Sequence, residues 1–186
     1  MCERQLSSDL DSIDKGHVAR YRFATSRVEG LVLDAACGCG YGSKMMNDGH
    51  AFVIGIDLEE EAIDFAKRHY PGPEYQLGDV TDRHGQFDWV VSFETIEHLK
   101  APELALRHFR ESINLIVSTP NAERYPFRPE SYAGDRFPHI RHYTDSELES
   151  LLNSTGWKVV EKHCQIEKRS EVTSGGGGMF HVWVCR

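Results

Sequence analysis

The stretch LVLDAACGCGYGS, residues 31–43, decides the fold of this chain. Its first six residues form an apolar run that carries a single acid, Asp34, and such a run favours a strand buried in a parallel sheet. Gly38, Gly40 and Gly42 follow. Glycines between a strand and a helix let the backbone turn tightly and approach a ligand closely, because a Cβ would clash there. The stretch therefore predicts a buried strand, a ligand-binding turn and a helix, in that order.

The same alternation of strands and helices continues along the chain. Further strands are expected at residues 51–57, 75–77, 87–93, 113–119, 157–162 and 179–185, and helices at 18–29, 44–48, 58–71, 102–111 and 145–155. Strand–helix alternation with short connections is typical of an α/β, doubly wound (Rossmann-like) fold. We expect a mostly parallel seven-stranded sheet with an antiparallel C-terminal strand.

Length and composition set the expected domain organisation. The chain has 186 residues, of which 40% are hydrophobic and 27% charged, and this suits one domain over residues 1–186. Within it, residues 1–28 are expected to form an N-terminal helical cap. The Pro- and aromatic-rich residues 121–143 are expected to form a loop on the substrate side.

Charge and cysteine content narrow the partners and the compartment. The formal net charge of −8 argues against nucleic acid as a general partner, although a local group of arginines keeps such a contact open: Arg124, Arg128, Arg136 and Arg141. No apolar run approaches the roughly 18 residues that a membrane span needs, and the first residues lack a signal-peptide core. Five irregularly spaced cysteines are typical of reduced thiols. We therefore expect a cytoplasmic protein without a membrane segment, and the oligomeric state stays open.

Acidic residues stand at the ends of four predicted strands: Asp34, Asp57, Asp79 and Glu94. In a doubly wound sheet, ligands bind outside the carboxyl ends of the strands, so these acids are expected to gather at one site. A single acid after a strand is more often a turn residue or a helix cap. The ordered set, and no single member of it, therefore indicates a binding site.

The spacing of the glycines argues against a dinucleotide. A dinucleotide fingerprint needs its third glycine at position 43, which is a serine here, and Asp34 would repel a pyrophosphate. The same carboxylate can attract an ammonium group, which points to a nucleoside that carries an amino-acid tail. Asp57 can accept hydrogen bonds from two ribose hydroxyls. Asp79 and Val80 suit the amino group and the ring face of adenine.

These motifs resemble those of class I S-adenosylmethionine-dependent methyltransferases, in particular the type-11-like group. The similar segments are VLDAACGCGYGS, VIGIDLEEEAIDFAK, LGDV, FDWVVSFETIEHL, IVSTPN and HIRHYTDSELESLLNSTGW. The resemblance implies S-adenosylmethionine as the cofactor, with its methionine part held by Asp34, Gly38 and Gly40, its ribose by Asp57, and its adenine by Asp79 with Val80. Ala36, Leu58 and Phe93 lie beside these residues and are expected to contact the cofactor. Arg20 or Tyr21 of the leading helix is expected to reach its carboxylate.

A second set of chemically active residues stands at positions 94–98, Glu-Thr-Ile-Glu-His. If a helix begins here, Glu94 shares a face with Glu97 or His98. His139, or as second choice His142, would complete an oxygen and nitrogen site suited to Mg²⁺, Mn²⁺ or Zn²⁺. A similar E-x-x-E-H with a distant histidine is a metal site in small-RNA 3′-terminal ribose methyltransferases, and quinone-ring O-methyltransferases have a similar arrangement. The alternative is that Glu97 and His98 cap a helix and orient loops without a metal.

The catalytic candidates are therefore Glu94, Glu97, His98 and His139. An alcohol or phenol acceptor has to lose a proton, and Glu94, His98 or His139 could take it. We expect a methyltransferase that acts on an oxygen atom of a small molecule, a metabolite or a sugar. The alternatives are a metal-assisted RNA 3′-terminal ribose methyltransferase and a catalytically inactive S-adenosylmethionine-binding protein, since a fold does not guarantee activity.

Overall fold

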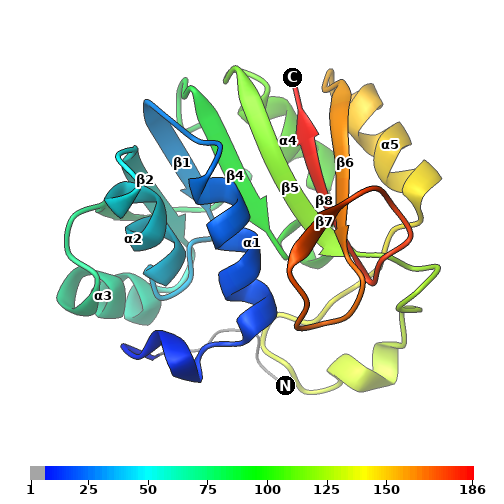
Figure 1. Ribbon diagram of the computed structural model, residues 1–186, viewed down its shortest axis with the longest axis horizontal. Coiled ribbons are helices and arrows are strands. Elements are labelled where there is room, and N and C mark those ends of the chain that lie inside the picture. Colours follow the sequence, from blue (N-terminus) through cyan, green and yellow to red (C-terminus); the bar gives the residue numbers. More distant parts are fainter. Residues whose placement is uncertain (1–6) are drawn as a thin grey trace.

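One sheet runs through the computed structural model, which describes residues 7–186, and helices cover both of its faces (Figure 1). The strands are β1 (Leu31–Ala35), β2 (Phe52–Asp57), β3 (Glu74–Leu77), β4 (Trp89–Phe93), β5 (Asn114–Pro120), β6 (Val159–Gln165), β7 (Val172–Ser174) and β8 (Phe180–Cys185). Their order in the sheet is β3-β2-β1-β4-β5-β8-β6-β7. β1 to β5 are parallel, and β8 lies antiparallel between β5 and β6. The doubly wound α/β fold is confirmed.

The sheet has eight strands where the sequence predicts seven. The additional strand is β7, which pairs antiparallel with β6 at the edge of the sheet. It is only three residues long, and both Thr173 and Ser174 are exposed, so no alternation of apolar and polar residues marks it. The antiparallel C-terminal strand, β8, lies where the sequence predicts it.

The sheet separates the core into two layers, and each layer is covered by helices. The helices are α1 (Lys15–Thr25), α2 (Tyr41–Asp48), α3 (Glu60–His69), α4 (Pro102–Phe109) and α5 (Asp145–Ser154), with short 3₁₀ helices η1 (Leu10–Ser12), η2 (Ile96–His98) and η3 (Pro129–Tyr132). α1, α2 and α3 pack on one face of the sheet, and α4 and α5 pack on the other. Successive strand residues point to opposite faces, so Val32 joins the first core and Leu33 the second.

None of the helices in residues 7–186 is long and apolar enough to cross a membrane. The expected N-terminal cap contains η1 and α1, and its residues 1–6 lie outside the described part of the chain. The extent of the domain over residues 1–186 stays a prediction.

The helix after the glycine turn begins earlier than the sequence predicts. α2 starts at Tyr41 and not at residue 44, so Gly42 is a helical residue. A Cβ at Gly42 would lie 2.2 Å from the ring of Tyr21 on α1. Gly42 therefore allows α1 and α2 to pack closely, and its role is in packing and not in ligand binding.

The order in which strands are added to the sheet reverses between β1 and β4, which are parallel neighbours. From β1 the chain adds β2 and β3 on one side, and it then returns to add β4 and β5 on the other side. Ligands of doubly wound folds bind at such a switch point, outside the carboxyl ends of the strands. Gly38 follows β1 at this place, and Glu94 follows β4.

Candidate active site

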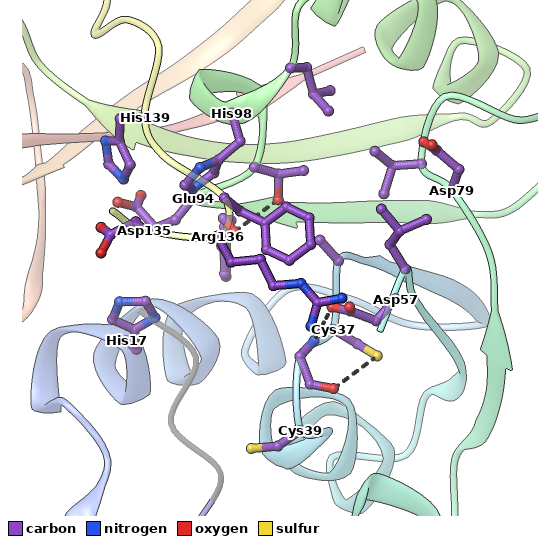
Figure 2. Close-up of a pocket in the computed structure, with 18 of the residues that line it drawn as sticks. His17, Cys37, Cys39, Asp57, Asp79, Glu94, His98, Asp135, Arg136 and His139 are labelled. Carbon is purple, nitrogen blue, oxygen red and sulfur yellow. Dashed lines mark hydrogen bonds between the residues drawn. The ribbon is translucent and has the colours of Figure 1, made fainter. Parts of the chain in front are cut away.

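A cavity of about 210 Å³ lies at the carboxyl ends of β1, β2 and β4. It is lined by these predicted site residues: Ala36, Gly38, Asp57, Leu58, Asp79, Val80, Phe93, Glu94, His98 and His139. Four other predicted residues do not line it: Arg20, Asp34, Gly40 and Glu97. Figure 2 shows Glu94, His98 and His139 at one end of the cavity and Asp57 and Asp79 at the other.

The glycine turn and Asp57 form one hydrogen-bonded unit. Gly38 adopts a φ of +57° and donates its N–H to Oδ2 of Asp57 over 2.9 Å. The second carboxylate oxygen, Oδ1, accepts the N–H of Glu59 over 3.0 Å. Asp57 therefore holds the backbone of two loops and at the same time lines the cavity. An acid after a strand can serve as a turn residue or as a ligand-binding residue, and the position of Asp57 is compatible with both roles.

Gly40 differs from Gly38 in what surrounds it. Its φ is +88°, and a Cβ there would lie 2.6 Å from Cβ of Ala66 and 2.8 Å from the hydroxyl of Tyr75. At Gly38, among residues 7–186, no atom outside the turn lies within 4 Å of the Cβ position. Gly38 is therefore the glycine of this turn that opens onto the cavity, whereas Gly40 packs against α3 and β3.

Asp34 lies beneath the turn and not in the cavity. Its carboxylate is fully buried and accepts hydrogen bonds from the hydroxyl of Tyr21, over 3.0 Å, and from that of Ser43, over 2.6 Å. Burial raises the pKa of Asp34 to about 7. The expected direct contact between Asp34 and a ligand ammonium group does not fit this geometry, because Asp34 is fully buried and does not line the cavity.

The raised pKa of Asp34 predicts a pH-dependent stability. The folded protein binds this proton more tightly than the unfolded chain does, so the free energy of unfolding should fall as the pH rises from about 4 to about 7. Asp34→Asn carries no such proton. Between pH 5 and pH 8 the wild type should lose about 2–3 kcal/mol relative to this variant in urea unfolding. Asp48→Asn, at an exposed ion pair with Lys44, is the matched control and should run parallel to the wild type. A parallel curve for Asp34→Asn as well would contradict the prediction.

Arg20 and Tyr21 have different surroundings in the structure, although both are candidates for contact with a ligand carboxylate. Arg20 is 1% exposed, donates from Nη1 to Oε1 of Gln165, and places Nη2 4.0 Å from Oε1 of Glu94. Its guanidinium lies 5.0 Å from the ring centroid of Phe180. Tyr21 bonds to Asp34 and lines the cavity. Arg20 therefore faces Glu94 and the C-terminal strands and not the cavity, and of the two only Tyr21 is placed at the cavity.

No helix begins at Glu94. The residue has a φ of +50°, its N–H donates to the carbonyl of Ser118, and only the single 3₁₀ turn η2 follows it. Oε1 of Glu94 accepts a hydrogen bond from the Ser118 hydroxyl over 2.8 Å. The condition under which Glu94 would share a helix face with Glu97 or His98 is therefore not met, because Glu94 has left-handed backbone and stands outside η2.

Glu97, His98 and His139 converge, and we call them the trio. Their potential ligand atoms all lie within 4.8 Å of one another. Glu97 is fully buried and accepts a hydrogen bond from the Thr119 hydroxyl over 3.1 Å, while the rings of His98 and His139 meet edge to face at 4.5 Å. Three of the four predicted metal ligands thus come together, and Glu94 is not part of this group.

The loop of residues 121–143 closes one side of the cavity. Tyr132, Asp135, Arg136 and Phe137 of this loop line the cavity. Nη1 of Arg136 lies 2.7 Å from Oε2 of Glu59, so the loop is tied to the corner after β2 (Figure 2 shows Arg136 extending across the cavity). An acid in a loop has no periodic pattern around it, and only the fold reveals that Asp135 faces the site.

The sequence and the fold both have known relatives. A family model described as "Methyltransferase domain" matches residues 15–162. A protein of Mycolicibacterium smegmatis named "Probable S-adenosylmethionine-dependent methyltransferase" is 31% identical over 77% of this chain and 58% of its own length. A ubiquinone biosynthesis O-methyltransferase of Coxiella burnetii is 32% identical over 70% of this chain and 64% of its own length. The chain thus spans about three fifths of the length of these relatives.

Solved structures show the same fold. The crystal structure of an S-adenosylmethionine-dependent methyltransferase from Mesorhizobium loti superposes with a TM-score of 0.74 at 16% identity, covering 96% of this chain and 100% of the other. At that identity the likeness concerns the fold alone. The resemblance found in the sequence motifs is therefore supported by a family model, by relatives in sequence and by the architecture.

Proposed function

This chain belongs to the methyltransferase-domain family, and from that premise we propose that it transfers the methyl group of S-adenosylmethionine to an oxygen atom of a small molecule. One observation carries the proposal: a single cavity has the Gly38–Asp57 unit at one end and imidazole and carboxylate groups at the other. The first end suits an adenosyl group, and the second suits an acceptor that must lose a proton.

The adenosyl end is supported by the geometry around Asp57. Asp57 lines the cavity, and a carboxylate at the end of the second strand suits the two ribose hydroxyls of an adenosyl group. Val80 is buried and apolar, as the face of an adenine ring requires, and Asp79 lies beside it in the cavity. Gly38 leaves space for close approach of the ligand to the turn.

S-adenosylmethionine supplies a methyl group already activated on a sulfonium. The protein therefore mainly has to hold the acceptor in line with that methyl group and exclude water. The loop of residues 121–143, held by the Arg136–Glu59 ion pair, covers the cavity and suits both tasks. His98 and His139 line the acceptor end and are the groups proposed to take the acceptor proton.

We further propose that the trio binds a divalent cation. One carboxylate oxygen and two imidazole nitrogens form a donor set that suits Mn²⁺ or Zn²⁺ better than Mg²⁺, which prefers oxygen. Such a cation would lower the pKa of an acceptor hydroxyl. Glu94 would not be a ligand, because Ser118 and Arg20 hold its carboxylate outside the trio.

A second candidate function follows from the same trio. The sequence motif at residues 94–98 resembles that of small-RNA 3′-terminal ribose methyltransferases, and the convergence of Glu97, His98 and His139 supports the likeness. A ribose hydroxyl is also an oxygen acceptor, so the two candidates differ in the acceptor and not in the chemistry. Methyl transfer to short RNA, measured beside transfer to a library of small hydroxylated metabolites, distinguishes them.

Calorimetry tests the cofactor assignment. We expect the purified protein to bind S-adenosylmethionine and S-adenosylhomocysteine with micromolar affinity and not to bind NAD⁺, because the turn lacks the glycine spacing of a dinucleotide site. NAD⁺ serves as the matched control, since it carries the same adenosine. A folded protein that ignores S-adenosylhomocysteine at millimolar concentration would overturn the proposed function.

A further inference from the structure

His142 lies next to the trio and forms a hydrogen bond with one of its members, His139. His142 is 7% exposed and is not part of the cavity wall. Nδ1 of His142 lies 2.6 Å from the carbonyl oxygen of Tyr125, and Nε2 of His142 lies 2.9 Å from Nδ1 of His139. A row of three groups therefore leads from a backbone carbonyl to a member of the trio.

The contact between His142 and the Tyr125 carbonyl determines which nitrogen of each histidine carries a proton. A carbonyl oxygen can only accept, so the proton between it and His142 belongs to Nδ1 of His142. A neutral His142 then carries its lone pair on Nε2. The 2.9 Å contact with His139 needs a proton between the two nitrogens, and that proton has to come from Nδ1 of His139. The lone pair of a neutral His139 is thereby left on Nε2.

The contacts of Tyr132 agree with this placement of the protons. Its hydroxyl lies 3.1 Å from Nε2 of His142, and its ring stacks on that of His139 at 4.2 Å with an angle of 10° between the planes. If Tyr132 supplied the only proton at Nε2 of His142, two lone pairs would face each other across the His139 contact. A doubly protonated His142 could reverse the row, but it would place a charge in a buried position. Tyr132 thus fixes the plane of His139, and the His142 contact fixes its proton.

We propose that His142 is a positioning residue that holds His139 in the tautomer with Nε2 unprotonated, the form that can bind a cation or accept a proton within the trio. The inference rests on the proposed role of the trio for its consequence in function. The tautomer itself is a property of the metal-free protein. The two parts can therefore be tested separately.

Nuclear magnetic resonance measures the tautomer directly. In protein labelled with ¹⁵N, long-range ¹H–¹⁵N correlation spectra distinguish imidazoles protonated at Nδ1 from those protonated at Nε2. We expect His139 and His142 both to carry their proton on Nδ1, with signals assigned through His139→Ala and His142→Leu. A metal-free His139 protonated on Nε2 would overturn the proposal, whatever the activity of the protein.

Variants of His142 test whether it acts through His139. His142→Leu removes the acceptor, whereas the side-chain amide of His142→Gln offers an oxygen to His139 and an N–H to the Tyr125 carbonyl. His142→Leu should lower the affinity for Mn²⁺ by about 10- to 100-fold and allow His139 to shift its proton to Nε2. His142→Gln should keep most of the affinity. Tyr125→Phe is the matched control, because the backbone carbonyl remains when the phenol hydroxyl is removed.

The outcomes separate the two proposals. If neither the wild type nor any variant binds Mn²⁺ or Zn²⁺, the metal proposal fails, while the measured tautomer still decides the role of His142. If His142→Leu is folded in its circular dichroism spectrum and keeps both the His139 tautomer and the Mn²⁺ affinity of the wild type, His142 has no positioning role.

Discussion

Glu97→Gln is expected to lower the rate of methyl transfer by roughly 100-fold or more, with the affinity for S-adenosylhomocysteine unchanged. The substitution keeps the size of the side chain and leaves an oxygen to accept the hydrogen bond from Thr119. It removes the only carboxylate of the trio, and with it the negative charge that a divalent cation requires. Glu97 does not line the cavity, so the adenosyl end is untouched. A methyl-release assay and calorimetry measure the two effects.

The matched control for this substitution is Glu149→Gln. Glu149 lies on α5, where it forms a partly exposed ion pair with Lys162 away from the cavity. Its replacement should change neither rate nor affinity, because exposed ion pairs contribute little. Treatment of the wild type with EDTA should reproduce the loss of rate seen in Glu97→Gln. If turnover survives both the substitution and EDTA, the trio takes no part in the reaction.

Asp57→Ala should weaken binding of S-adenosylhomocysteine by about 1–3 kcal/mol, or roughly 5- to 150-fold in affinity. The carboxylate is proposed to accept the ribose hydroxyls, and it also holds the N–H groups of Gly38 and Glu59. Its loss leaves polar groups of the ligand without acceptors and frees the turn that faces the cavity. Calorimetry gives the affinity, and a thermal unfolding curve shows how much of the effect comes from the protein itself.

Asp48→Ala is the control for Asp57→Ala. Asp48 is the last residue of α2, and its ion pair with Lys44 lies on the exposed side of the helix. The control should bind S-adenosylhomocysteine as the wild type does. An Asp57→Ala protein that is folded and retains full affinity would refute the assignment of Asp57 to the ribose.

Local patterns were enough to predict the order of strands and helices. Buried parallel strands are continuous apolar runs, and the apolar residues of a helix recur with the helical period. Both patterns can therefore be recognised from residues that are close together in the sequence. The glycine turn and the acid at the end of β2 are equally local, and the prediction of a cavity lined by Gly38 and Asp57 follows from them. β7 was not predicted, because a strand of three residues at the sheet edge is too short to show a pattern of apolar and polar residues.

The sequence by itself determined which residues stand at the carboxyl ends of the strands, because a parallel sheet aligns those ends at one edge. Only the tertiary structure decided which way their side chains point. Hydrogen bonds from Tyr21 and Ser43 hold Asp34 beneath the turn. The left-handed backbone of Glu94 separates it from the trio. His139 meets Glu97 and His98 because a long loop folds back over the cavity, and contacts between distant segments depend on the packing of the whole chain and leave no periodic trace in the sequence.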